Sequence, residues 1–171
     1  MTPVQIATVL IMCTQHFAPS TAQHVIQAES SGNPLAIGVN GHRLRRQPQS
    51  KAQAIAWARW LVVHRYNIDV GLWQVNIANW KTYGITPENA FDPCRNTMAG
   101  SAVFTRFYLR AARKYGAGQT ALLHAISAYN TGDFSSGFAN GYVERVIRAT
   151  SPGNRFASKY LSDADVQRER P

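Results

Sequence analysis

The sequence lacks the motifs by which proteins usually bind metals. Its two cysteines, Cys13 and Cys94, lie far apart, its five histidines are scattered, and it contains neither CxxC nor HExxH. Because a metal site needs several such ligands close together, we expect no metal and no cofactor. An exported protein would join the two cysteines in a disulfide, whereas a cytosolic protein would keep two buried thiols.

Long apolar stretches are also missing. The one candidate, residues 4–12, has no basic residue before it and no small-residue cleavage site after it. We therefore expect it to form the first helix of the domain, and neither a signal peptide nor a membrane span. The chain has no internal repeat, and its 171 residues suffice for one core. We expect a single domain over residues 1–149 and a polar, flexible tail over residues 150–171.

Acidic residues are scarce: nine Asp and Glu stand against 18 Lys and Arg, which gives a net charge of +9. Such an excess favours contact with a polyanion, be it cell wall, nucleic acid or membrane surface, or it simply keeps the protein soluble. Specific nucleic-acid binding has little support. The basic residues Arg43, Arg45, Arg46 and Lys51 lie in an expected loop without interleaved aromatic residues on which bases could stack.

Apolar periodicity predicts a mostly helical α+β protein. Helices are expected at residues 3–14, 50–66, 96–115, 119–129 and 142–149, and a further one begins at a Ser20–Gln23 capping box and ends at Gly32 and Pro34. On the 50–66 helix, the side expected to face inward carries Ile55, Ala56, Trp60 and Val63. Asn40-Gly41 predicts a small hairpin between residues 36–39 and 42–44, and residues 67–77 form a strand or loop.

One acid stands where a helix normally carries an apolar residue. Ala22, Val25, Ile26 and Glu29 follow the i, i+3, i+4, i+7 spacing of a buried helix face, and Glu29 falls in the last turn. The negative end of the helix dipole and the loss of water both raise the pKa of Glu29. A carboxyl group that stays protonated near neutral pH can act as the general acid of glycoside cleavage. A hydrogen-bonded structural Glu, or a frayed helix end, would show the same spacing.

Three further segments suit a saccharide cleft around Glu29. Residues 71–76 offer the aromatic face of Trp73 and the amides of Gln74 and Asn76. Residues 128–132 supply Tyr129 and Asn130, and residues 141–143 supply Tyr142. Each segment alone is typical of core or turn material, so their combination matters more than any one of them.

The chain resembles the lytic transglycosylases that carry the soluble-lytic-transglycosylase (lysozyme-like) domain. Four motifs occur in the same order: Glu-Ser-Ser-Gly-Asn-Pro from Glu29, Gly-Leu-Trp-Gln from Gly71, Ala-Tyr-Asn-Thr-Gly from Ala128 and Gly-Tyr-Val from Gly141. Residues 36–41, 69–76 and 91–94 are similar to the branch that serves type IV secretion and conjugation machines. The resemblance covers residues 12–148.

The resemblance implies a lysozyme-like single domain with the small hairpin beside the catalytic cleft. It also implies cleavage of the β-1,4 bond between N-acetylmuramic acid and N-acetylglucosamine, in the periplasm, to open peptidoglycan for a secretion channel. The partners are then glycan strands and secretion-system proteins, although no export signal precedes the domain here. By the resemblance, Glu29 is the catalytic acid and base, and Ser30, Gln74, Tyr129, Asn130 and Tyr142 line the site.

Trp73 departs from the family pattern, in which many members carry Met at this position. Two other functions remain open on the residues alone: a hydrolysing muramidase, and a non-catalytic adaptor that binds glycan through its basic face. For an exported enzyme of this kind we expect a disulfide between Cys13 and Cys94.

A second catalytic carboxylate is not evident. Of the remaining acids, Asp69 alone directly precedes a cleft segment, and we expect its side chain to cap the turn at Gly71. Glycosidases that use water or a covalent intermediate generally need such a second acid. Without one, the 6-hydroxyl of the sugar closes on the anomeric carbon, and the product is a 1,6-anhydro sugar, as the resemblance also implies.

Overall fold

The computed structural model describes residues 1–14 and 18–149. In chain order its elements are α1 (Pro3–Cys13), α2 (Pro19–Ser30), β1 (Ile37–Val39), α3 (Lys51–Val63), β2 (Ile68–Val70), β3 (Val75–Asn76), the 3₁₀ helix η1 (Ile77–Asn79), α4 (Trp80–Tyr83), α5 (Pro93–Tyr115), α6 (Gln119–Thr131), α7 (Ser136–Ala139) and α8 (Tyr142–Arg148). This arrangement confirms the predicted α+β class. The expected tail over residues 150–171 lies outside the described residues, so the domain boundary stays a prediction.

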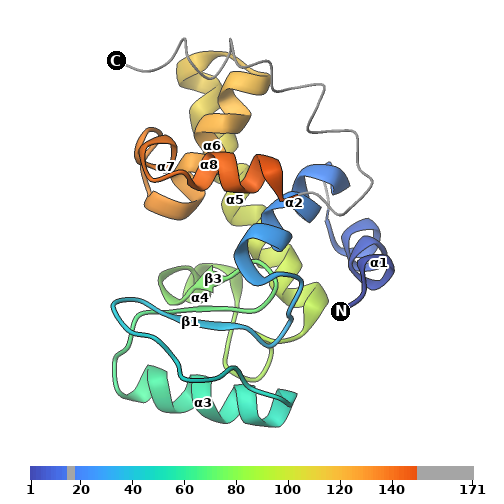
Figure 1. The fold of residues 1–171 in the computed structure, drawn as a ribbon, viewed down its shortest axis with the longest axis vertical. Coiled ribbons are helices and arrows are strands. Elements are labelled where there is room, and N and C mark those ends of the chain that lie inside the picture. Colours follow the sequence, from blue (N-terminus) through green and yellow to red (C-terminus); the bar gives the residue numbers. More distant parts are fainter. Residues whose placement is uncertain (15–17, 150–171) are drawn as a thin grey trace.

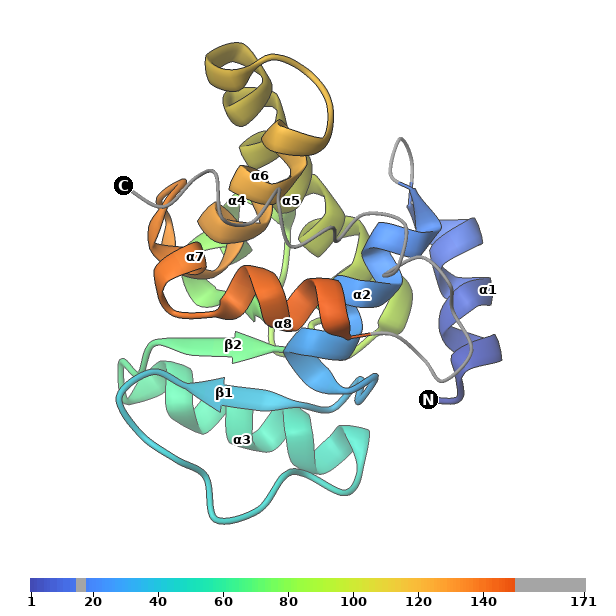
Figure 2. The same cartoon turned by 45° about the horizontal axis from the view of Figure 1, so that its top comes forward.

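Helix α5 is the longest element and the one around which the others gather. It packs extensively against α6 and α1, and it runs from the end of the molecule that holds the sheet toward the end that holds α6 (Figure 1). Strands β1 and β2 lie between α3 on one side and α2 and α8 on the other (Figure 2). The molecule therefore has a sheet-and-α3 part and a helical part, which meet near the end of α2.

The sheet corrects the hairpin that the sequence predicted. The strand order is β1-β2-β3, all antiparallel, with Ile37 opposite Val70 and Val39 opposite Ile68. Segment 42–44 contributes only a single bridge, from His42 back to Val39. The reason is burial: Ile68 and Val70 are fully buried, and the buried side chains of β1 pair with them, whereas His42 is exposed.

Helix α3 buries a different side from the one predicted. Its inward residues are Ala54, Ala58 and Leu61, while Trp60 and Val63 are 54% and 76% exposed. The expected cap is present, because the Ser50 side chain accepts a hydrogen bond from the backbone N–H of Gln53. The small alanines let α3 approach the sheet closely, so small side chains, and not the largest ones, mark the buried face.

The ends of helices α1 and α2 differ in what holds them. Helix α2 begins with Pro19 at its first position and has no side-chain cap, so the predicted Ser20–Gln23 box is wrong. Cys13 at the end of α1 is bonded to Cys94 at the start of α5, with 5.4 Å between the Cα atoms and a sequence separation of 81. In the chain-entropy model, closing so long a loop stabilises the fold by about 4 to 5 kcal/mol.

Candidate active site

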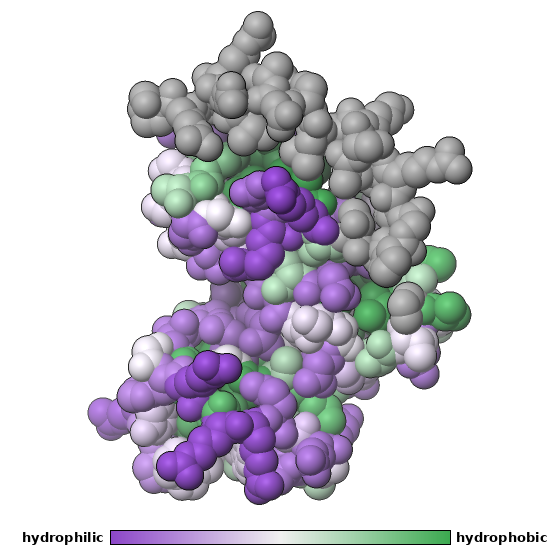
Figure 3. Space-filling model, viewed as in Figure 1, coloured by the Kyte–Doolittle hydropathy of each residue, from purple (hydrophilic) through white to green (hydrophobic). Residues whose placement is uncertain are grey.

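Glu29 lies in the last turn of α2, as its spacing predicted. Ala22, Val25 and Ile26 on the same helix face are buried in the core, and the helix ends where Ser31 adopts a left-handed conformation with φ of 52°. The buried face of α2 thus ends at a cleft of about 400 Å³, and Glu29 is the residue of α2 that lines this cleft. The surface is hollowed between the part that carries α7 and the part that carries the sheet (Figure 3), and hydrophilic residues gather there.

Two walls form the cleft. The helical wall consists of Glu29 from α2, Val103 and Phe107 from α5, and Tyr129 from α6. The sheet wall consists of Asn40, Asp69, Gln74 and Asn76. Residues from distant parts of the sequence therefore meet around one acid.

The surroundings of Glu29 keep its carboxyl group protonated near neutral pH. Burial is the main cause that raises the pKa of Glu29 to about 7, and the negative charge of Asp69 raises it further. A hydrogen bond from the Tyr142 hydroxyl to Oε1 of Glu29 lowers this pKa, and so does the positive charge of Arg145. At pH 7 a large share of the molecules therefore carries a proton on Glu29, as a general acid requires.

Tyr142 supports Glu29 from behind and does not face the cleft. The side chain is 1% exposed, and its hydroxyl donates to the Glu29 carboxylate. The guanidinium of Arg145 lies 5.0 Å from the centre of the Tyr142 ring and helps to hold that ring in place. The prediction that Tyr142 lines the site for substrate is therefore corrected: this residue positions the acid.

Tyr129 lines the cleft together with Glu29, but its hydroxyl binds a backbone group. It donates to the carbonyl oxygen of Trp73 at 2.7 Å, which ties α6 to the segment between β2 and β3. Burial raises the pKa of Tyr129 well above its ordinary value, and the charges of Glu29 and Asp69 add to this effect. Asn130 also lines the cleft, is exposed, and accepts a hydrogen bond from Asn140.

Trp73 is fully buried, so it offers no face on which a sugar ring could stack. It packs directly on α5 at Gly100, where even a Cβ atom would lie 2.3 Å from the Cβ of Trp73. The predicted substrate-binding role of Trp73 is therefore wrong for its side chain. The sequence could not show this, because the glycine that makes room for the indole stands 27 residues further on.

Ser30 and Asn96 hold the segment that carries Gln74. The Ser30 hydroxyl donates to the carbonyls of Ile26 and Leu72, so it links the end of α2 to this segment and does not line the cleft. Asn96, which is 1% exposed, accepts from the Trp73 N–H and donates to the Val70 carbonyl. No local pattern indicated this role for Asn96, because it rests on contacts across 23 and 26 residues.

Amides dominate the sheet wall, and they hold Asp69. The Nδ2 groups of Asn76 and Asn40 each donate to one oxygen of the Asp69 carboxylate, both at 2.8 Å. Asp69 therefore does not cap the Gly71 turn as predicted, since it lies in β2 directly opposite Asn76 of β3. Burial raises the pKa of Asp69 above its ordinary value, and the hydrogen bonds from Asn76 and Asn40 offset only part of this rise.

Gln74 lines the cleft with its amide group fixed. The Nε2 group donates to the carbonyls of Ala36 and Gly71, and the residue has a φ of 44°, in the left-handed region. With both N–H donors engaged, the oxygen of this amide is the group left to accept from a ligand hydroxyl or acetamido N–H. Asn76 is engaged more fully, because its Oδ1 also accepts from the backbone N–H of Ala78.

The cleft thus combines a carboxyl group with a raised pKa, a second carboxylate and a set of fixed amides. Within residues 1–14 and 18–149, no three His, Cys, Asp or Glu side chains come together as metal ligands would. A larger cavity of about 520 Å³ runs along α5 and is lined by Met12, Met98 and several arginines. The lining of that cavity contains no Asp or Glu, whereas the smaller cleft contains both Glu29 and Asp69.

Comparison with known proteins gives a consistent result. The family model described as "Transglycosylase SLT domain" matches residues 11–150. The chain is 40% identical over 156 residues to the "Type IV secretion system protein virB1" of Brucella abortus biovar 1 (strain 9-941), which covers 90% of this chain and 61% of that protein. It is 39% identical over 145 residues to the "Protein virB1" of Agrobacterium fabrum (strain C58 / ATCC 33970), covering 80% of this chain and 56% of that protein.

The chain therefore spans about three fifths of the length of these curated relatives. No solved structure gives a significant match. Across the described part of the chain, none of the helices has the length and apolar character needed to cross a membrane.

Proposed function

The chain belongs to the family defined by the transglycosylase SLT domain, and from this premise we propose that it is a peptidoglycan lytic transglycosylase. It cleaves the β-1,4 bond between N-acetylmuramic acid and N-acetylglucosamine and leaves a 1,6-anhydro-muramic end. The observation that carries the proposal is Glu29, a carboxyl group with a pKa of about 7 inside a cleft whose other wall is rich in amides. Such amides suit the hydroxyl and acetamido groups of amino sugars.

The first chemical step uses the proton of Glu29. Glu29 gives this proton to the glycosidic oxygen, the bond from that oxygen to C1 of the muramic residue breaks, and the electron pair stays with the oxygen. C1 is left with oxocarbenium-like positive charge. The 2-acetamido group of the sugar assists from within, and the charge of Asp69 across the cleft stabilises the cation.

The second step returns the proton. The Glu29 carboxylate takes the proton of the 6-hydroxyl, O6 bonds to C1, and the anhydro ring closes without water. Tyr142 keeps the carboxylate of Glu29 in place between the two steps, because it donates to Oε1. One residue thus serves as acid and then as base.

A hydrolysing muramidase is a second candidate, and the position of Asp69 favours it. The sequence left Asp69 at a turn, whereas the structure has its carboxylate in the same cleft as Glu29. A retaining hydrolase needs a second carboxylate as nucleophile. Against this role, both oxygens of Asp69 accept hydrogen bonds from Asn40 and Asn76, which weakens a nucleophile and suits a fixed charge.

The names of the relatives support a biological setting for this activity. Because one of them is named as a type IV secretion system protein, we place this enzyme with such a machine, where it opens the cell wall locally in the periplasm. A non-catalytic adaptor of the same machine would bind glycan without cutting it.

Digestion of purified sacculi separates these candidates. We expect the chain to release muropeptides that end in anhydro-muramic acid, which borohydride does not reduce, and Glu29→Gln to release almost none. Products heavier by one water and reducible by borohydride would make the protein a hydrolase. Binding to sacculi without any release by the wild-type protein would make it an adaptor.

A further inference from the structure

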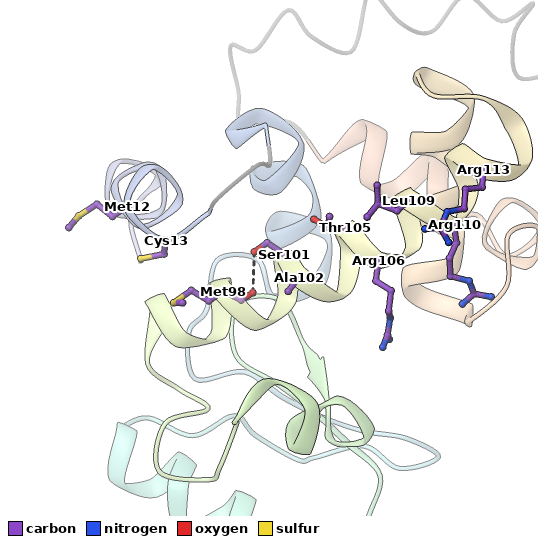
Figure 4. A pocket seen from close by; sticks show the side chains of 10 residues that line it. All are labelled: Met12, Cys13, Met98, Ser101, Ala102, Thr105, Arg106, Leu109, Arg110 and Arg113. Carbon is purple, nitrogen blue, oxygen red and sulfur yellow. Dashed lines mark hydrogen bonds between the residues drawn. The ribbon is translucent and has the colours of Figure 1, made fainter.

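The cavity of about 520 Å³ along α5 shares no lining residue with the Glu29 cleft, and we call it the α5 groove. At one end, the last turn of α1 forms its wall with Met12 and Cys13, and the disulfide from Cys13 to Cys94 fixes this wall on α5. Figure 4 shows the two α1 residues beside the Met98 end of the groove, and three arginines toward the other end of α5. The groove therefore has an apolar end and a basic end.

A row of apolar and small side chains runs along the groove. Met98, Ala102, Thr105 and Leu109 follow one another at spacings of four, three and four residues, which is the 3.5-residue period of a helix face that packs along another helix. Met98 and Leu109 are 45% and 52% exposed, although both are apolar. Ala102 and Thr105 between them are small, so the backbone of a neighbouring helix can approach closely. The row covers about three helical turns, or about 16 Å, and suits a partner helix of that length.

Three arginines form a second row beside the first. Arg106, Arg110 and Arg113 follow one another at spacings of four and three residues, and all three are exposed. The guanidinium groups of Arg106 and Arg110 lie 5.5 and 5.9 Å from the ring centre of Phe107, and Arg106 donates one hydrogen bond to Asn79. These contacts position the positive charges but do not neutralise them.

The groove supplies no carboxylate of its own. Helices α1 and α5 contain neither Asp nor Glu. Across residues 1–14 and 18–149, the ion pairs are Arg59–Glu88 and Arg148–Glu144, and none of these four residues lines the groove. A second copy of the chain docked through the same face would bring more arginines and no carboxylate, which disfavours self-association. The complementary partner is apolar along the first row and carries carboxylates, which guanidinium groups bind with paired hydrogen bonds.

We propose that the α5 groove is a docking site for an acidic amphipathic helix of another protein. The apolar side of that helix packs on the row from Met98 to Leu109, and its carboxylates bind Arg106, Arg110 and Arg113. A flat lipid surface would reach the arginines but would leave the floor of the groove unfilled, so the hollow shape favours a helix. Because the groove lies apart from Glu29, the inference is independent of the proposed function.

Three synthetic peptides of three heptads each serve as probes. The first carries leucine along one helix face and glutamate beside it, the second has lysine in place of glutamate, and the third has alanine in place of leucine. Each is titrated into the full chain labelled with ¹⁵N, and NMR maps the backbone signals that shift. We expect the glutamate peptide to shift the signals of α5 and of the last turn of α1, and to bind about tenfold more tightly than either of the other two.

A charge exchange tests the arginines. In Arg110→Glu/Arg113→Glu the preference should reverse, so that the lysine peptide binds more tightly than the glutamate peptide. The matched control is Arg43→Glu/Arg45→Glu, which changes the same charge in an exposed loop outside the groove and should keep the preference of wild type. Should the first variant fail to fold, Leu109→Ser at an exposed position decides: it should weaken binding of the glutamate peptide, and an unchanged affinity would overturn the proposal.

The remaining outcomes all contradict the proposal. Equal binding of the glutamate and lysine peptides, no binding of the glutamate peptide, or shifts confined to other elements would mean that the groove does not recognise an acidic helix. Shifts in the groove with phosphatidylglycerol vesicles, and none with the glutamate peptide, would make it a lipid-binding surface. A dimer in sedimentation experiments that Leu109→Ser abolishes would make it an interface between two copies of this chain.

Discussion

On the helical wall, Glu29 lies beside Val103, Phe107 and Tyr129, and Tyr142 contacts it from behind the wall; on the sheet wall, amides surround Asp69. On the helical wall, burial dominates, and one hydroxyl contacts the Glu29 carboxyl group. On the sheet wall, each oxygen of Asp69 receives an N–H from an asparagine. Burial raises the pKa of both carboxyl groups, but two amide N–H donors stabilise the ionised form of Asp69, whereas Glu29 receives one hydroxyl donor, so the two groups are suited to different tasks.

The charge of one wall also acts on the other. The negative charge of Asp69 is among the causes that raise the pKa of Glu29, so the two groups titrate as a coupled pair. In the proposed mechanism the second carboxylate contributes twice: its charge raises the pKa of the acid before cleavage, and it stabilises positive charge on the sugar during cleavage.

The largest effect is expected from the acid itself. Glu29→Gln preserves the shape of the side chain but removes the proton donor, so lytic activity should fall on the order of a hundred- to ten-thousand-fold. The rate of release of soluble muropeptides from sacculi measures this, with circular dichroism as a control for folding. Near wild-type activity would remove Glu29 from the mechanism.

The sheet wall is tested by Asp69→Asn, which keeps the size of the side chain, removes its charge and leaves one of its two acceptor oxygens. We expect kcat to fall on the order of a hundredfold, the size of one electrostatic contact of a few kcal/mol. The product should stay anhydro-muramic acid, because the ring closure needs only Glu29. An activity loss as large as that of Glu29→Gln, with a wild-type product that is a reducing sugar, would make Asp69 the nucleophile of a hydrolase.

Two tyrosine variants separate the acid from its scaffold. Tyr142→Phe removes the hydrogen bond that lowers the pKa of Glu29, so the high-pH limb of the kcat/KM profile should move to higher pH. Tyr129→Phe removes the same hydroxyl group from a bond to the Trp73 carbonyl. It should reduce turnover and cost about 1 kcal/mol of stability, but leave the pH profile in place. A shift of equal size in both variants would mean that neither hydroxyl acts on Glu29 specifically.

The smallest effect concerns stability. The pKa of Glu29 is about 7 in the folded protein and about 4.5 in the unfolded chain, so the folded state binds the proton more tightly. Folding stability should therefore fall as pH rises from about 4.5 to 7, by up to about 3 kcal/mol, and Glu29→Gln should abolish that fall.

Melting temperatures at pH 4 and pH 8 test the sign of this effect. The melting temperature of Glu29→Gln minus that of wild type should be several °C larger at pH 8 than at pH 4. The control is Glu88→Gln: hydrogen bonds lower the pKa of Glu88, so this variant should not gain stability at high pH. Equal melting-temperature differences for Glu29→Gln at both pH values would contradict a raised pKa.

The sequence predicted the helical wall better than the sheet wall, and the reason is the range of the contacts. The inward position of Glu29 follows from the spacing of Ala22, Val25 and Ile26 within one helix. The position of Asp69 depends on β2 pairing with β1, and on Asn40, which is 29 residues away. The position of Asp69 could have been predicted from a hairpin between β2 and β3 across residues 71–74, because this pairing sets Asp69 opposite Asn76.

The orientation of Trp73 also depends on a residue that is distant in the sequence. A glycine on α5 decides that its indole turns into the core, and nothing near Trp73 in the sequence reports this. The residue types of the Gly71–Asn76 segment were thus sufficient to place it at the cleft, but not to say which of its side chains face the ligand.

A titration of the two carboxyl groups tests the central claim most directly. With carboxyl carbons labelled with ¹³C, NMR should show Glu29 titrating near pH 7 in the wild-type protein while Asp69 titrates at lower pH. In Asp69→Asn the pKa of Glu29 should fall, because a charge that raises it is gone. If Glu29 instead titrates at the ordinary value of about 4.5, it is ionised at neutral pH, and the division of tasks between the two walls is wrong.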